Sequence, residues 1–132
     1  MSQRDKDKGL GLTLVLDLDE TLVHYDSARR AYLVRPGCSW FLEAVSQYYE
    51  IVIFTASMSR PADLILNKLD PDGSLISHRL YRQHTQKIHD YKYVKDLSRL
   101  GRSLARTLII DNLKENFERQ PENGVKCHTW TG

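Results

Sequence analysis

The stretch LTLVLDLDETLVH, residues 12–24, decides how the chain folds. Its opening apolar run, which ends at Leu16, is short and follows two glycines, so it favours a strand buried on both faces. Two carboxylates come next, because only Leu18 separates Asp17 from Asp19. Acids that follow a strand are common as turn formers and helix caps, so this pair alone does not establish a chemical site.

Composition is typical of one small domain. The 132 residues fit a single domain, and a hydrophobic fraction of 41% is enough to form a core. A net charge of +2 argues against broad electrostatic binding to nucleic acid. No apolar run approaches the roughly 18 residues that a membrane span needs. Residues 1–11 carry alternating charges and no signal-peptide pattern, so we expect a solvated N-terminal tail.

Cysteine and histidine usage argues against a disulfide framework and against a zinc site. Cys38 and Cys127 lie far apart and neither belongs to a CxxC pair, which favours a reducing compartment. We expect both to be small buried side chains, Cys38 at the start of a helix and Cys127 in a strand. The histidines show no spacing typical of zinc ligands.

Apolar strands and amphipathic helices alternate along the chain. The expected strands are residues 12–16, 50–54, 107–110 and 125–130, and the expected helices are residues 38–48 and the segment from an N-cap at Ser59 to residue 69. Buried strands separated by helices indicate a parallel sheet covered on both faces. We therefore predict one α/β domain over residues 12–132, with a short hairpin or flap at residues 24–35.

Periodicity also predicts which side chains the helices bury. The inner faces are expected to carry Trp40, Phe41, Ala44, Val45 and Tyr48 in the first helix, and Leu64, Ile65 and Leu69 in the second. Asn112 and Glu115 have the spacing of a capping box, although such a box usually starts with Ser or Thr.

Polar residues follow three of the expected strands at the point where each ends. They are Asp17 and Asp19, Thr55 and Ser57, and Asp111 and Asn112. In an open parallel sheet the carboxyl ends of the strands share one edge, and ligands bind in the crevice beyond it. Residues that are distant in the sequence can therefore meet in one cleft.

Two neighbouring acids need relief from their mutual repulsion. If the strand continues through them, Asp17 and Asp19 point to the same side, roughly 6–7 Å apart along the chain. A cation is one relief, and the oxygen set of Asp17, Asp111 and Asn112 suits Mg²⁺. Protonation is the other relief, in which Asp19 becomes a proton donor while Asp17 stays ionised.

The combination of these residues predicts phosphoryl transfer. An ionised Asp17 can attack phosphorus and form an aspartyl-phosphate, while Mg²⁺ and a lysine, for which Lys95 is the candidate, neutralise the growing charge. Thr55 offers a hydroxyl, and the backbone N–H groups after it offer an anion pocket at a helix start. Each residue alone has an ordinary explanation: Thr55 as a strand end, Lys95 as a solvated lysine, and residues 111–112 as a helix cap.

Four segments carry a resemblance to a known family. DLDETLVH, IFTAS, YVKDLSRLG and IIDN occur in that order, and the chain resembles the haloacid dehalogenase (HAD) superfamily. More narrowly, it is similar to the small phosphatases of the RNA polymerase II C-terminal domain, the NLI-interacting-factor-like family. The resemblance runs from about Leu12 to Trp130. It implies a Rossmann-like three-layer sandwich with a central, mostly parallel sheet whose first strand is central, and a short flap insert after that strand.

The resemblance implies a role for each polar residue. Asp17 would be the phosphoryl-accepting nucleophile, and Asp19 the general acid and then the base. Thr55 would bind the phosphate, and Lys95 would hold the phosphate and the nucleophile. The Mg²⁺ ligands would be Asp17, Asp111, Asn112 and the backbone carbonyl of Asp19.

The sequence departs from the family in two places. Relatives carry a longer insert between the positions of His24 and Arg35, where it helps to select the substrate peptide. In the short segment here, Tyr25 and Tyr32 either contact a peptide or pack the flap against the core. Relatives also continue past the last strand with an acidic turn and a Leu-rich helix. Either the domain is trimmed at its C-terminus, or the Trp130 region lacks a cover and leaves an apolar patch for a partner or a second copy.

Three functions follow as alternatives. The first is a Mg²⁺-dependent protein serine/threonine phosphatase whose partner is a phosphoprotein or phosphopeptide, with the polymerase C-terminal domain as substrate by kinship alone. The second is a peptide-binding module resembling the mitochondrial import receptor of the same fold, whose members tend to depart from the DxD pattern kept here. The third is a nucleic-acid end phosphatase, against which the arginines are interspersed with acids. Kinship favours a nuclear location over a cytoplasmic one, although no basic localisation cluster is present.

Overall fold

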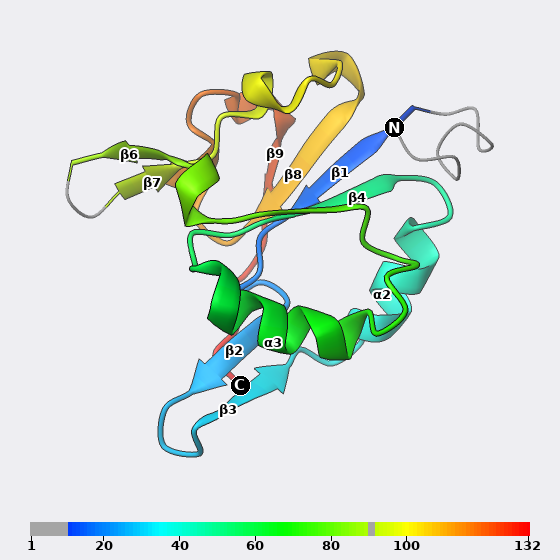
Figure 1. The fold of residues 1–132 in the computed structure, drawn as a ribbon. Helices are drawn as coiled ribbons and strands as arrows, with labels where there is room; N and C mark the ends of the chain where they lie inside the picture. Colours follow the sequence, from blue (N-terminus) through cyan, green and yellow to red (C-terminus); the bar gives the residue numbers. More distant parts are fainter. Residues whose placement is uncertain (1–10, 90–91) are drawn as a thin grey trace.

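The computed structural model describes residues 11–89 and 92–132, and its centre is a five-stranded parallel sheet (Figure 1). The strands are β1 (Thr13–Leu16), β4 (Glu50–Phe54), β5 (His78–Leu80), β8 (Thr107–Asp111) and β9 (Gly124–Lys126). Their order across the sheet is β5-β4-β1-β8-β9, and every neighbouring pair is parallel. The predicted α/β fold with a central first strand is confirmed. Apart from Gly11, the predicted N-terminal tail lies outside the described residues.

The register of β1 sets the level at which the polar strand ends appear. All four residues of β1 are buried, as a strand between two parallel neighbours requires. Leu16 lies beside Ile53 of β4 and Ile110 of β8, so these three strands end within one residue of the same height. Asp17 extends the ladder by one hydrogen bond, in which its N–H donates to the Ile110 carbonyl at 3.0 Å.

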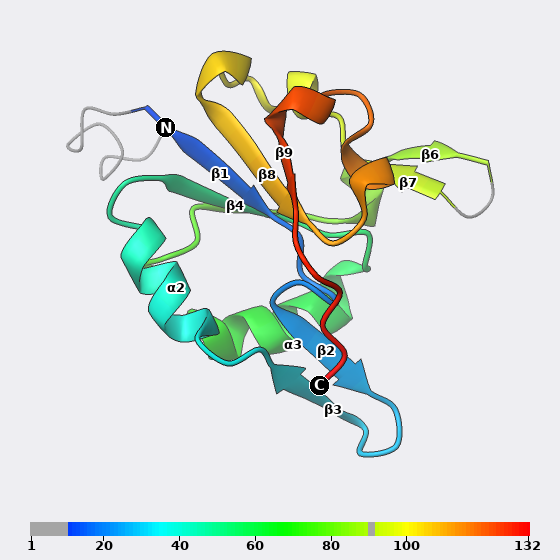
Figure 2. The ribbon, with the colours of Figure 1, turned by 180° about the vertical axis from the view of Figure 1, so that it is seen from behind.

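Alternate side chains of the sheet enter two separate cores. On one face, Leu16 and Ile53 pack against α2 (Cys38–Val45) and α3 (Ser59–Leu69), which Figures 1 and 2 show on the same side of the sheet. On the other face, Val15 and Ile109 pack against short 3₁₀ turns, η2 (Leu97–Leu100) and η4 (Lys114–Phe117). The three layers are therefore present, but 3₁₀ turns form the second outer layer. The remaining turns are η1 (Arg82–His84), η3 (Leu104–Arg106) and η5 (Pro121–Asn123).

Two antiparallel hairpins project from the sheet. The first, β2 (Val23–Asp26) with β3 (Ala31–Val34), is the predicted flap. Tyr25 and Tyr32 lie opposite each other on it, with ring centroids 5.2 Å apart in an edge-to-face arrangement. Tyr32 packs against the core, whereas Tyr25 is 46% exposed. The second hairpin, β6 (Gln86–Ile88) with β7 (Lys92–Val94), was not predicted.

The predicted inner face of α2 is partly wrong. The helix ends at Val45, so Tyr48 lies beyond it, and Trp40 is 73% exposed. Cys38 and Leu42 are the residues that α2 buries. These two are four positions apart and share one face, while Trp40 lies midway between them and therefore points to the opposite side.

The start and one face of α3 also differ from the prediction. Ser59 is the first residue of the helix, and Met58 takes the N-cap position without a side-chain hydrogen bond. The prediction that Leu64 faces the core is wrong, since its side chain is 68% exposed. The buried stripe is Ala62, Ile65, Leu66 and Leu69, whose spacing of three and four leaves Leu64 outside it.

The C-terminal segment is less regular than expected. β9 ends at Lys126, so Cys127 follows the strand and is only partly buried. The predicted capping box is absent, because η4 has Leu113 at its N-cap position and Asn112 turns toward the strand ends. Beyond β9 the chain runs toward the first hairpin (Figure 2), where the Trp130 N–H donates to the Glu20 carbonyl at 2.9 Å.

Glu50 ties the start of β4 to distant parts of the chain. Its buried carboxylate accepts two hydrogen bonds from the Arg102 guanidinium, at 2.8 and 2.7 Å, and lies 3.1 Å from His78 Nε2. The hydrogen bonds from Arg102 hold the pKa of Glu50 below its ordinary value of 4.5, although burial works against this. This cluster stabilises the end of the sheet opposite the polar strand ends.

We expect Arg102→Met to lower the free energy of unfolding by about 3 kcal/mol at neutral pH, because it leaves the Glu50 carboxylate buried without its main partner. A lowered pKa in the folded state contributes stability above the unfolded pKa and loses it as pH falls through the folded pKa. The effect of the substitution should therefore be full above pH 4.5 and shrink as pH falls below 4.5 through the lowered pKa of folded Glu50. Urea unfolding at several pH values measures this, with Glu50→Gln/Arg102→Met as the control. A loss that is independent of pH would contradict the assignment.

Candidate functional site

Lys95 lies between two carboxylates at the carboxyl ends of β1 and β8. Its Nζ donates to Asp17 Oδ1 at 2.7 Å and to Asp111 Oδ2 at 2.6 Å. The lysine and Asp111 are fully buried, and Asp17 is nearly so. The structure therefore brings these three predicted site residues into direct contact.

The chain leaves β1 by a tight turn rather than by a longer strand. β1 ends at Leu16, so the strand does not continue through both acids, and the condition for their pointing to the same side is not met. The Leu18 carbonyl accepts the N–H groups of Leu22 and Val23 at 2.9 and 3.2 Å, which closes the turn. As a result Asp17 faces Lys95, while Asp19 faces the end of β4.

Burial and neighbouring charges set the protonation of the buried triad. Burial raises the pKa of Asp17 from 3.8 to about 6, against the attraction of Lys95 and with a further contribution from Asp111. Burial opposes the charge of Lys95, but the two carboxylates outweigh it and raise the pKa of the ammonium above 10.5. Lys95 is therefore a fixed cation, and Asp17 is a carboxyl that titrates within reach of neutral pH.

Two residues that sequence reasoning missed hold the carboxylates in place. The Thr21 hydroxyl donates to Asp17 Oδ2 at 2.9 Å. The Asn116 amide donates to both oxygens of Asp111 at 3.2 Å, and its backbone carbonyl accepts the Lys95 N–H at 2.8 Å. Thr21 lies four residues after Asp17, and this spacing is the only local signal that could have indicated it.

Asn112 gives a direct test of whether the site suits a metal ion. One terminal atom of its amide lies 2.9 Å from Asp17 Oδ2 and 3.2 Å from Asp111 Oδ1. With nitrogen there, the amide donates to both carboxylates. With oxygen there, three acceptors face one another, which is favourable only around a cation. Adjacent ligands of an octahedral Mg²⁺ are about 3 Å apart at Mg–O distances of about 2.1 Å, so both distances from the Asn112 amide suit this ion.

The candidate ligand set depends on an amide rather than on a third acid. Within residues 11–89 and 92–132, no group of three His, Cys, Asp or Glu side chains is placed to hold a metal ion. The Asp19 side chain points to Ser57 instead of this oxygen set, and the ligand role of its backbone carbonyl stays a prediction. The donor set is thus two carboxylates with neutral oxygens, the kind that Mg²⁺ accepts along with water.

Asp19 is held by hydroxyl groups from the end of β4. The Ser57 hydroxyl donates to Asp19 Oδ2 at 2.6 Å, and the Thr55 hydroxyl reaches the same oxygen at 3.4 Å. Thr55 also accepts the Ser57 N–H at 3.0 Å, which fixes the loop before α3. The second acid therefore lies beside the predicted phosphate-binding residue and close to the N-terminus of a helix, where backbone N–H groups attract anions.

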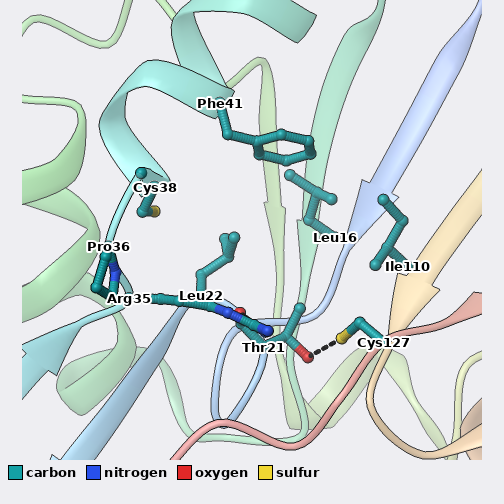
Figure 3. A pocket seen from close by; sticks show the side chains of 10 residues that line it. Leu16, Thr21, Leu22, Arg35, Pro36, Cys38, Phe41, Ile110 and Cys127 are labelled. Atoms are coloured by element: carbon teal, nitrogen blue, oxygen red, sulfur yellow. Dashed lines mark hydrogen bonds between the residues drawn. The ribbon is translucent and has the colours of Figure 1, made fainter. Parts of the chain in front are cut away.

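A mostly apolar cavity of about 270 Å³ is lined by Leu16 and Thr21, which are close to the nucleophile in the chain, and by none of the acids (Figure 3). Leu16, Ile110 and Phe41 contribute apolar walls, and the Cys127 thiol lies 3.7 Å from the Thr21 hydroxyl. Arg35 is the charged residue of its lining, and none of Asp17, Asp19 and Asp111 reaches it. The position of the cavity against Thr21 means that packing there supports the residue that holds Asp17.

A comparison with known families agrees with this geometry, since the family described as NLI interacting factor-like phosphatase matches residues 12–132. The chain belongs to this family. The family domain thus includes all the site residues described above.

Proteins with different names are similar to this chain. A probable C-terminal domain small phosphatase of Dictyostelium discoideum is 41% identical over 89% of this chain and 44% of its own length. The mitochondrial import inner membrane translocase subunit TIM50 of Kluyveromyces lactis is 40% identical over 92% of this chain and 26% of its own length. The chain therefore spans less than half the length of these relatives.

Solved structures support the fold. Fcp1, an essential RNA polymerase II CTD phosphatase, superimposes with a TM-score of 0.74 over 94% of this chain and 43% of its own chain, at 21% identity. At this identity the likeness concerns the fold alone. No helix in the described part of the chain is long and apolar enough to cross a membrane.

In the metal-free protein we expect Asp17 to titrate near pH 6. A folded pKa above the unfolded value of 3.8 means that this group favours folding at low pH and that its contribution is lost as pH rises through 6. Mg²⁺ should lower the pKa, because a cation favours the ionised form. Carboxyl ¹³C NMR, assigned with Asp17→Asn, measures both effects. A pKa that does not respond to Mg²⁺ would argue against Asp17 as a ligand.

Proposed function

We propose that this chain is a Mg²⁺-dependent protein serine/threonine phosphatase that acts through an aspartyl-phosphate on Asp17. The observation that carries the proposal is the contact of Lys95 with Asp17 and Asp111, next to an Asn112 amide that can complete an oxygen set. Membership of a phosphatase family supports the same reaction class.

The first half of the reaction transfers the phosphoryl group to the protein. Asp17 attacks phosphorus with one carboxylate oxygen as the bond to the seryl or threonyl oxygen breaks. Asp19 gives its proton to that leaving oxygen, which departs as an alcohol. Lys95 keeps Asp17 ionised and oriented, and its positive charge favours the anionic phosphoryl group.

The second half restores the enzyme. Asp19, now ionised, takes a proton from a water molecule, and the water oxygen attacks phosphorus as the bond to Asp17 breaks. Phosphate leaves, and Asp19 holds the proton for the next cycle. Thr55 and the N–H groups at the start of α3 bind the phosphoryl oxygens through both halves. Mg²⁺, held by Asp17, Asp111, Asn112 and the Asp19 carbonyl, would supply positive charge against the charge on those oxygens.

The substrate class follows from kinship and from the shape of the flap. Two relatives are named as C-terminal domain small phosphatases, and Fcp1 is an RNA polymerase II CTD phosphatase. We therefore propose a phosphoserine or phosphothreonine peptide as substrate, with the polymerase C-terminal domain as the first candidate. Tyr25 leaves nearly half of its surface exposed on the first hairpin and offers an apolar contact to such a peptide. The relatives' names point to different compartments, so a nuclear location stays a prediction.

Asp17→Asn should lower phosphate release from a phosphoserine peptide on the order of 10³-fold or more, because the nucleophile is lost. The matched control is Asp72→Asn, since Asp72 is an exposed acid in the turn after α3 and should keep full activity. Removal of Mg²⁺ by a chelator should abolish turnover, and added Mg²⁺ should restore it. Activity that survives both Asp17→Asn and metal removal would overturn the proposal.

The identity with TIM50 proteins supports a second candidate, a peptide-binding module with weak or no activity. Phosphate release and peptide binding by the same preparation discriminate between the two. A phosphatase should turn over a phosphopeptide and bind the dephosphorylated peptide weakly. Tight binding of an unphosphorylated peptide, with no release from any phosphate ester, would favour the module. For the nucleic-acid end phosphatase, no feature of the site adds support beyond the scattered arginines.

A further inference from the structure

We propose that Ser57 is a positioning residue that fixes which oxygen of Asp19 carries the transferable proton. The assignment rests on the proposed function, because it concerns the proton that Asp19 gives to the leaving oxygen. Family membership names no role for Ser57, and its part here comes from its contacts alone.

Both donors that reach the Asp19 carboxyl in the described chain reach the same oxygen. Ser57 Oγ lies 2.6 Å from Asp19 Oδ2, a length typical of a hydroxyl donating to a carboxylate. The Thr55 hydroxyl lies 3.4 Å from that oxygen and is a weak second donor. An oxygen that accepts these hydrogen bonds is the acceptor oxygen of the protonated acid, so the proton belongs on Oδ1.

Three hydrogen bonds hold the loop that carries Ser57. Its N–H donates to Thr55 Oγ1 at 3.0 Å, and its carbonyl accepts the Arg82 N–H at 3.0 Å. The Arg82 Nε donates to the Ala56 carbonyl at 2.7 Å. The Ser57 hydroxyl is therefore fixed relative to β4. Its hydrogen bond fixes the carboxyl of Asp19 in turn, because Asp19 lies in the turn after β1 and not within that strand.

A carboxyl that is free to rotate would turn either of its oxygens toward the leaving group, but only one of the two oxygens carries a proton. Ser57 removes this ambiguity by occupying Oδ2. In the reaction, the Oδ1–H bond breaks and the proton bonds to the leaving oxygen, while the hydrogen bond from Ser57 to Oδ2 strengthens as Asp19 becomes anionic. Ser57 itself neither gains nor loses a proton.

The prediction is a change in leaving-group dependence. A phosphoserine peptide expels an alkoxide and needs protonation, whereas 2,4-dinitrophenyl phosphate expels a stable phenolate and does not. We expect Ser57→Ala to lower kcat/KM on the order of 10-fold to 100-fold for the peptide and less than about 3-fold for the dinitrophenyl ester. The loss for the peptide is smaller than the roughly 10²–10⁴-fold that a general acid supplies, because Asp19 itself is still present. A residue with a merely structural role would lower both values alike.

Three further variants complete the test. Ser57→Thr keeps the hydroxyl and should restore the peptide rate. Ser57→Cys keeps the size with a weaker donor and should fall between serine and alanine, which gives a second measurement if Ser57→Ala does not fold. Ser39→Ala, an exposed serine on α2, is the matched control. Each variant is compared by thermal unfolding.

The outcomes separate this assignment from the proposed function. If wild-type protein is active and Ser57→Ala changes both substrates equally, or changes neither, Ser57 does not position Asp19. If the wild-type protein releases no phosphate from either substrate, the proposed phosphatase fails and this assignment fails with it. Loss confined to the peptide, with rescue by Ser57→Thr, supports the role.

Discussion

The site depends on one buried lysine. Lys95 reaches two carboxylates that leave adjacent strands at the same height, and each contact is shorter than 3 Å. Burying three charges costs several kcal/mol per ion, and the mutual attraction offsets that cost only when the geometry is good. The register of β1 and β8 supplies this geometry, because Leu16 lies beside Ile110, and Asp17 and Asp111 are the residues that directly follow these two. Two carboxylates and one ammonium leave a net negative charge, which is the condition for attracting a cation while keeping the nucleophile ionised.

The parts of the fold that could be predicted are those set by short-range patterns. Continuous apolar runs indicated the strands that became β1, β4 and β8, and parallel topology then implied that their polar ends meet. The faces of the helices could not be predicted as well. Trp40 and Leu64 belong to apolar patterns in the sequence but lie on outer surfaces, because a short helix buries only the stripe that faces the sheet. Which stripe this is depends on how α2 and α3 sit on the sheet, and no local pattern carries that information.

Some residues of the candidate site could likewise be predicted from the sequence, and others could not. Asp17, Asp19, Thr55 and Asp111 could be predicted because they stand at strand ends, where topology alone brings them together. Thr21 and Asn116 could not, because their roles arise from turns whose shape the sequence does not reveal: Thr21 acts from the turn that follows Leu18, and Asn116 from a 3₁₀ turn. Asn112 was predicted as a ligand and as part of a cap. The structure excludes the cap, since the Asn112 amide faces the carboxylates and not the backbone of η4, and the ligand role stays a prediction.

The pattern of supporting contacts bears on the choice between a phosphatase and a binding module. A module that only holds peptides has no need to bury a lysine between two acids, or to aim a serine at one oxygen of a third acid. In this chain each acid has its own donor: Thr21 for Asp17, Ser57 for Asp19, and Asn116 for Asp111. Buried charges without a use are costly, and a core of apolar residues would be as stable or more so. The presence of three separately oriented acids therefore favours chemistry at this site over peptide binding alone, the role suggested by the similarity to TIM50.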